Sequence, residues 1–175
     1  MYNKTSGPAH GVDAIDSANF FDYDANGNLT RAQETDGIRD YDYDTQNRLK
    51  SVAKAGVTLA AFTYDDSGER TLKTAGGKTR HFIYPFHEQE GSDETDYVYL
   101  NGLRVAAVEN GALRYIHGDH LGSTQVVSNT SGASVATARY EPFGEFSSTT
   151  PPTKSGNFYT GQYFDNADCK HKCDK

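Results

Sequence analysis

The chain has 175 residues, of which 35% are hydrophobic, and a formal net charge of −7. This acidic excess, without any dense run of Lys and Arg, argues against nucleic acid as a partner. No apolar stretch is long enough to insert in a membrane and the first residues lack the apolar region of a signal peptide, so we expect a soluble chain whose export does not depend on this N-terminus.

The composition favours an all-β fold. Aromatic residues make up 12% of the chain, as 12 Tyr and 9 Phe with no Trp, and 17 Gly accompany many Asp, Asn, Ser and Thr. Aromatic side chains pack well on the pleated surface of a sheet, and the small polar residues form turns. We therefore expect many short strands joined by tight turns, and little helix.

Residues 1–19 are expected to form an irregular N-terminal segment, and a repeat occupies residues 20–95. Its copies at 21–29, 41–49 and 62–70 read FDYDANGNL, YDYDTQNRL and FTYDDSGER. A fourth copy breaks off at Pro85, and the central tyrosines lie 20, 21 and 20 residues apart: Tyr23, Tyr43, Tyr64 and Tyr84. This fixed period indicates stacked copies of one unit, none of which can bury its apolar face alone.

Each copy is expected to form a strand, a turn and a returning strand. The aromatic–polar–Tyr alternation places both rings on one face of the strand. An aspartate then accepts a hydrogen bond from the backbone two residues on, and three residues after it a residue that tolerates a left-handed backbone closes the turn. Because the aspartates recur, we interpret them as turn formers rather than as a catalytic pair. The aspartates are Asp24, Asp44 and Asp65, and the residues that close the turns are Gly27, Asn47 and Gly68.

Residues 96–165 predict a meander of hairpins. Asn101-Gly102 and Asn110-Gly111 each separate two strand-like runs, which is the strongest short-range signal of a hairpin. A further run at 124–128 turns at 129–132 and returns toward Tyr140. Residues 146–156, rich in Ser, Thr and Pro, are expected to form a polar loop.

The recurring Phe/Tyr-x-Tyr-Asp-x-x-Gly/Asn pattern resembles the YD repeat. Downstream, the segments 115–124, 140–145 and 158–162 read YIHGDHLGST, YEPFGE and FYTGQ. In this order and spacing they resemble the Rhs repeat-associated core of bacterial polymorphic toxins. The resemblance to the Rhs/YD-repeat family covers most of the chain from residue 20 to about 165. It marks as core motifs Asp119, His120, Leu121, Gly122, Ser123, Tyr140, Pro142, Phe143, Gly144 and Gly161.

The resemblance implies an array of antiparallel β-hairpins, part of a spiralling sheet that forms the wall of a hollow shell. In the family this shell encloses a C-terminal toxin used in interbacterial competition. The implied partners are therefore the remainder of the shell and a toxin cargo, and the implied role is structural, non-catalytic and free of cofactors. The implied location is secreted or on the cell surface as part of a larger protein, and cytoplasmic before export.

The resemblance ends before residues 166–175, an atypical charged tail. The family carries aromatic strands and a cleavage motif at this point, and neither the motif nor a toxin is found in this sequence. We therefore expect a truncated form or a change of reading frame, and we carry over neither autoproteolysis nor toxicity.

One histidine cluster has the residue types of a metal site. His117, Asp119 and His120 carry suitable zinc ligands. A tight turn through Gly122 explains the same residues, and no other His or Cys is placed to complete a ligand set. We favour the turn.

Two cysteines, Cys169 and Cys173, lie in the last residues and flank His171. A metal clip and a charged tail with two free thiols both fit this spacing, which matches no established zinc signature. We favour the tail. The cysteines leave the redox compartment open, and they provide no disulfide framework for the body of the chain.

Two alternatives to a structural role remain open. Rows of exposed tyrosines bind sugars through their ring faces, which would make the chain a carbohydrate-binding or adhesion module that recognises cell-surface glycans. An enzyme, either a remnant of an autoprotease or a metal hydrolase built on His117 and His120, ranks well behind both.

Overall fold

The computed structural model describes residues 2–3, 14–15, 19–34, 36–83, 85–140 and 159–161. Their regular structure is β-strand, apart from one turn of 3-10 helix, η2 (Tyr159–Gly161). The chain divides into two compact units between Gly77 and Lys78. None of the described segments is a helix with the length and apolarity needed to pass through a membrane.

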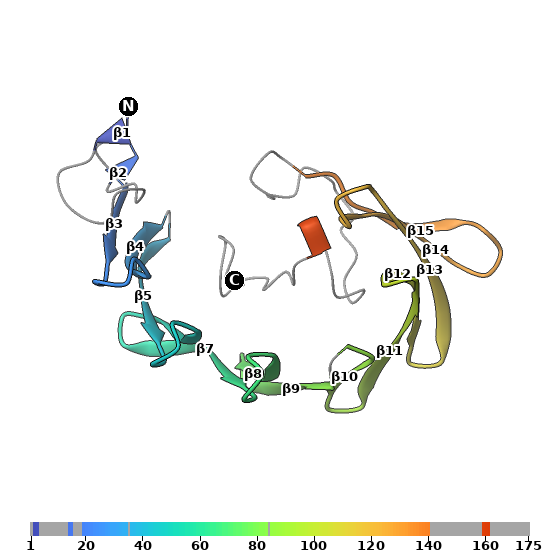
Figure 1. Cartoon of the computed structure of the whole chain (residues 1–175), viewed down its shortest axis with the longest axis horizontal. Helices are drawn as coiled ribbons and strands as arrows, with labels where there is room; N and C mark the ends of the chain where they lie inside the picture. Colours follow the sequence, from blue (N-terminus) through green and yellow to red (C-terminus); the bar gives the residue numbers. More distant parts are fainter. Residues whose placement is uncertain are drawn as a thin grey trace. The chain divides into compact units, whose positions relative to one another are not determined.

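In the first unit each strand pairs antiparallel with the next strand along the chain, so that the order in the sheet is the order in the sequence (Figure 1). The sheet thus grows by adding one hairpin after another. The strands are β1 (Tyr2–Asn3), β2 (Ala14–Ile15), β3 (Asn19–Tyr23), β4 (Leu29–Glu34), β5 (Gly37–Tyr43), β6 (Leu49–Lys54), β7 (Val57–Tyr64) and β8 (Arg70–Ala75).

The second unit follows the same rule, with antiparallel pairing between successive strands. Its strands are β9 (Lys78–Ile83), β10 (His87–Glu90), β11 (Asp93–Leu100), β12 (Leu103–Glu109), β13 (Ala112–Gly118), β14 (Thr124–Ser128) and β15 (Ser134–Thr137). The expected fold class, an all-β array of antiparallel hairpins, is confirmed.

One face of each sheet is buried, and aromatic residues contribute to it. In β5 the buried Tyr41 alternates with exposed aspartates, and in β11 the buried Tyr97 precedes the exposed Val98. In the second unit Tyr97 packs with Ala107 and Ile116 of the two following strands, and Tyr99 lies against this cluster. The period-two alternation therefore buries the face that the sequence predicts.

Both Asn-Gly hairpins form where the sequence predicts them. Asn101-Gly102 joins β11 to β12 with φ values of 51° and 79°, and Asn110-Gly111 joins β12 to β13 with 49° and 81°. Two consecutive residues with positive φ match the right-handed twist of the flanking strands, and asparagine and glycine adopt this conformation at the lowest cost.

Some elements do not follow from local sequence signals. Strand β10 is polar and follows Pro85, yet it pairs with both of its neighbours, and its buried Glu88 accepts a hydrogen bond from the Tyr97 hydroxyl at 2.9 Å. Two short strands, β1 and β2, lie within the expected irregular segment 1–19. The boundaries 1–19, 20–95, 96–165 and 166–175 stay predictions.

We expect Val52→Ala to lower the free energy of unfolding of the 175-residue chain by about 2 kcal/mol, because it leaves a cavity in a closed core. Val52 in β6 is fully buried, whereas Val57 in the neighbouring β7 is 66% exposed. Val57→Ala is the matched control and should change stability by no more than about 0.5 kcal/mol. Urea denaturation followed by circular dichroism measures both, and equal effects would contradict a core on this face.

Candidate functional site

Within the described residues five turns share one architecture, and three of them are the turns of the complete repeats. They span residues 24–28, 44–48, 65–69, 119–123 and 129–133. In each, the first N–H donates to the fifth carbonyl at 2.9–3.0 Å, and the fourth N–H donates to the first carbonyl at 3.0–3.3 Å. The fourth residue has a positive φ of 61–94° in every case, in the order Gly27, Asn47, Gly68, Gly122 and Gly132.

The first residue of each turn, an Asp or Asn, closes it with its side-chain oxygen. In all five turns Oδ1 of this residue accepts the fifth backbone N–H at 2.8–3.0 Å. It also accepts the third N–H in four of them, at 2.9–3.0 Å, and the Ser67 hydroxyl in the turn 65–69. The predicted bond from the backbone two residues on is thus present at Asp24 and Asp44, and it also occurs in the turns 119–123 and 129–133.

Neighbouring turns of the first unit are joined by side-chain hydrogen bonds. The amide groups of Asn26 and Asn28 both donate to Oδ1 of Asn47, at 2.9 and 2.8 Å. These residues belong to consecutive repeats, so the period of the sequence places equivalent turns side by side at one edge of the sheet. We call this row of linked turns, 24–28, 44–48 and 65–69, the turn ladder.

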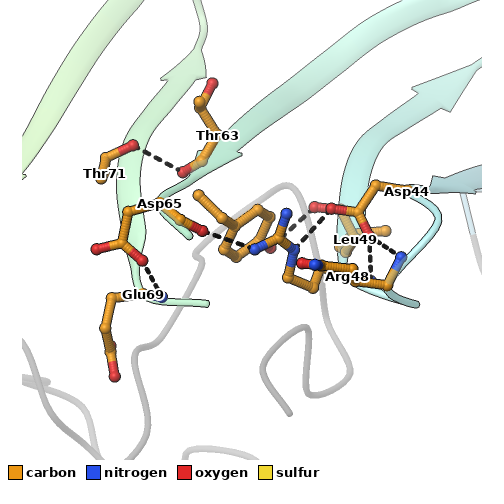
Figure 2. Close-up of polar contacts among 9 residues, drawn as sticks. Asp44, Arg48, Leu49, Thr63, Asp65, Glu69 and Thr71 are labelled. Carbon is orange, nitrogen blue, oxygen red and sulfur yellow. Dashed lines mark hydrogen bonds and ion pairs between the residues drawn. The ribbon is translucent and has the colours of Figure 1, made fainter. Parts of the chain in front are cut away.

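Arg48 provides the next link of the turn ladder. Its Nε donates to Oδ2 of Asp44 in its own turn at 2.6 Å, and its Nη1 donates to the carbonyl oxygen of Asp65 in the following turn at 2.8 Å (Figure 2). The guanidinium also lies 5.0 Å from the centre of the Tyr64 ring. One arginine therefore fixes the spacing of two turns through an ion pair, a carbonyl contact and an aromatic face.

Two tyrosines donate their hydroxyl hydrogen bonds to the first residue of a neighbouring strand. The Tyr64 hydroxyl donates to the Leu49 carbonyl at 2.8 Å, across to the start of β6. In the second unit the Tyr140 hydroxyl donates in the same way to the Thr124 carbonyl at 2.7 Å, at the start of β14. Leu49 and Thr124 both directly follow a five-residue turn. Each phenol therefore links its own segment of chain to the strand start that follows such a turn.

Hydrogen bonding lowers the pKa of the turn carboxyls below the usual value of 3.8. For Asp24 the largest cause is the Asn28 side chain, for Asp44 the backbone N–H of Arg48, and for Asp65 the Ser67 hydroxyl. Burial opposes the shift at Asp119, but the N–H groups of Ser123 and Leu121 still leave its pKa lowered. The ionised form is thus the one that the turns select.

Tyr43 and Tyr140 stay in the neutral form, because the pKa of each phenol is raised. Burial, aided by the charge of Asp24, raises the pKa of Tyr43 to about 12. Burial and the charge of Asp119 raise the pKa of Tyr140 above its ordinary value as well.

Some residues of the expected core motifs lie close together in the second unit. Gly161 of η2 lies against the turn 119–123, where a Cβ atom on Gly122 would stand 3.9 Å from the Gly161 nitrogen. The Tyr159 ring lies 5.5 Å from that of Tyr140. Ser123 is fully buried, whereas His120 and Leu121 are exposed. Pro142, Phe143 and Gly144 lie outside the described residues, as do Tyr84, Cys169 and Cys173.

No group of three or more His, Cys, Asp or Glu that could hold a metal ion occurs within the described ranges. His117 contacts a hydroxyl instead, since its Nε2 lies 2.8 Å from the Ser128 Oγ. Asp119 uses its carboxylate within the turn and toward Gln125, whose Nε2 donates to Oδ2 at 3.1 Å. His117 and Asp119 are therefore both engaged in hydrogen bonds of the fold.

Sequence reasoning missed the arginines that pack on aromatic rings. Arg70 takes the place of Leu29 and Leu49 after its turn, and its guanidinium lies 4.6 Å from the Phe62 ring centre. In the second unit Arg104 lies 3.7 Å from the Tyr97 ring centre and donates to the Tyr99 hydroxyl at 2.8 Å. The available signal was an arginine at an apolar repeat position, as for Arg70.

Comparison with known proteins fits this architecture. The family model of the Teneurin YD-shell matches residues 21–166. The chain belongs to the Teneurin YD-shell family. The tRNA3(Ser)-specific nuclease WapA of Bacillus spizizenii is 30% identical over 144 residues, and the tRNA nuclease WapA of Bacillus subtilis (strain 168) is 29% identical over the same length. Both matches cover 76% of this YD-shell chain and 6% of the relative.

Solved structures share the fold of this YD-shell chain. The crystal structure of TcdB2-TccC3-Cdc42 superimposes with a TM-score of 0.57 at 14% identity, covering 83% of the chain. The crystal structure of TcdB2-TccC3-TEV gives 0.55 at 14% identity and covers 85%. In each case the match takes up 11% of the solved chain. The YD-shell chain thus corresponds to a small part of much longer proteins.

We expect Tyr64→Phe to lower the free energy of unfolding by about 1 kcal/mol, because it removes the hydrogen bond to the Leu49 carbonyl and leaves the ring in place. Tyr115→Phe is the matched control, since Tyr115 is 43% exposed. It should leave stability unchanged within error. Guanidinium denaturation of both variants tests the contribution of this hydrogen bond. A loss of stability at Tyr64→Phe no larger than that at Tyr115→Phe would refute it.

The melting temperature of the chain should stay level from pH 7 to about pH 5 and fall as the pH drops below 4. The turn carboxyls have a lower pKa in the folded chain than in the unfolded chain, so the stability that they contribute is complete above the unfolded pKa. It is lost as the pH falls through the folded pKa. Asp44→Asn should flatten the acid limb measured by calorimetry, because it removes the carboxyl whose pKa the Arg48 N–H lowers. An acid limb as steep as that of the unmodified chain would contradict this role of Asp44.

Proposed function

We propose that the chain is a structural, non-catalytic segment of the wall of an Rhs/YD-repeat shell, which encloses a C-terminal toxin used in interbacterial competition. The turn ladder is the observation that carries this proposal. Every hairpin of the ladder is joined to the next one by backbone pairing and by side-chain links between turns, so a sheet of this kind extends without an internal limit. Such a sheet suits the construction of an enclosure.

The names of the relatives support the toxin part of the proposal. The two WapA proteins are named as tRNA nucleases, and this chain corresponds to 6% of their length. The turn carboxylates of this chain are engaged in hydrogen bonds of the fold, so we assign the nuclease chemistry to another part of such proteins. The partners proposed for the chain are the rest of the shell and the cargo inside it.

We assign structural roles to the repeat and core motif residues. Asp24, Asp44, Asp65 and Asp119 form the turns, and Gly27, Gly68 and Gly122 supply their left-handed residue. We further propose that the chain acts outside the cytoplasm, secreted or at the cell surface as part of a larger protein.

The carbohydrate-binding alternative receives less support. Tyr41 and Tyr97 are buried, and the hydroxyl of Tyr64 is bound to Leu49, so these rings offer little free face to a sugar. A glycan array with the 175-residue chain tests it. Saturable binding that is lost in Tyr115→Ala, the variant of an exposed tyrosine, would favour adhesion.

Electron cryomicroscopy of the full-length gene product that contains this chain tests the enclosure. We expect residues 19–140 to form part of a continuous sheet around a closed space that contains density for the cargo. Limited proteolysis of the same product should leave the cargo intact at denaturant concentrations that keep the shell folded. A solid sandwich without an internal space, or a cargo that is cut at the same rate as the isolated cargo domain, would contradict the proposal.

A further inference from the structure

The residue before the turn is a tyrosine in the repeats, whereas the residue before the turn 119–123 is Gly118. The strand pairing shows that the two positions are equivalent. Tyr64 pairs with Arg70 across its turn, and Gly118 pairs with Thr124 across the turn 119–123. The residue two positions earlier is buried in both strands, as Phe62 in β7 and Ile116 in β13. Gly118 therefore stands on the aromatic face at the place of the repeat tyrosine.

A pocket of about 250 Å³ lies at this place. Its lining includes Gly118 itself, Ile116, the start of β12 at Leu103 and Arg104, Tyr99 of β11, and Gly161 of η2. In the first unit the Tyr64 phenol occupies the equivalent place. Its hydroxyl reaches Leu49 at the start of β6, the strand before β7, just as Leu103 and Arg104 lie at the start of β12, the strand before β13. The absence of a side chain at position 118 thus accounts for the pocket.

We propose that this pocket binds the aromatic side chain of a tyrosine or phenylalanine from a polypeptide held against the sheet. The guest would take the place that Tyr64 fills from within the chain in the first unit. The size agrees, because an apolar cavity of about 150 Å³ already takes up benzene. The inference rests on the proposed function only for the source of the polypeptide, which is the enclosed cargo.

The chemistry of the lining suits a phenol ring. Ile116 and Leu103 offer apolar contact, and the glycines allow the ring to lie close to the backbone. Arg104 is held in place by the Tyr99 hydroxyl, which accepts from its Nε at 3.1 Å and its Nη2 at 2.8 Å. Arg48 contributes the corresponding cation to the Tyr64 ring in the turn ladder. An aromatic guest therefore meets the same types of group as the tyrosine of the repeat.

Calorimetric titration of the 175-residue chain with p-cresol, the side-chain analogue of tyrosine, tests the site. We expect saturable binding at one site with a dissociation constant of about 0.1–1 mM. Gly118→Tyr should fill the pocket, raise the melting temperature and weaken p-cresol binding at least about tenfold. Gly118→Ala is the matched control, because its added Cβ stands at ordinary contact distance, 3.4 Å from the Ser123 carbonyl oxygen, and it should retain binding.

Nuclear magnetic resonance of the unmodified chain keeps the test independent of whether Gly118→Tyr folds. The amide signals of Gly102, Gly118, Gly122 and Gly161 should shift with p-cresol and with N-acetyltyrosinamide, and those of Gly56 and Gly132 should not. A folded chain that shows no shifts, that responds equally at all of these glycines, or that binds methyl glucoside in place of p-cresol overturns the inference. Such a result would leave the enclosure test by microscopy unaffected, so the two failures are distinguishable.

Discussion

The repeat turns and the turns 119–123 and 129–133 each depend on one side-chain oxygen. In each five-residue turn this oxygen accepts a backbone N–H that strand pairing cannot satisfy, and a left-handed fourth residue brings that N–H within reach. The turn also sets the strand register, because the residue before it pairs with the residue after it, as Tyr43 pairs with Leu49. A shift of one residue would move the aromatic residues to the other face of the sheet. Local turn chemistry thus decides which face is buried.

The sequence predicts this level of structure well, because the signals are local. The repeat aspartates, the left-handed residues and the two Asn-Gly pairs each act within five residues of chain. The sequence did not predict that the turns 119–123 and 129–133 share the architecture of the repeat turns, because Gly118 and Ser128 stand where the repeats have tyrosine. The turn needs only its first and fourth residues, so its sequence signature is shorter than the repeat pattern.

Contacts between turns could not be predicted, because they depend on which turns share an edge and at what distance. Nothing local distinguishes Arg48, which spans two turns, from the exposed Lys50 two residues later. Strand β10 escaped prediction for a related reason. Its polar residues form a strand because both neighbouring strands offer backbone partners, and the hydrogen bond from the Tyr97 hydroxyl compensates for the burial of Glu88.

The independence of turn and preceding residue has a consequence for function. If the tyrosine before the turn were required to form it, every five-residue turn would be preceded by a tyrosine ring. Since hydrogen bonds within residues 119–123 close the turn without it, glycine at position 118 removes a ring and keeps the register of β13 and β14. A sheet built in this way can vary its surface one position at a time without changing the strand pairing that holds it together.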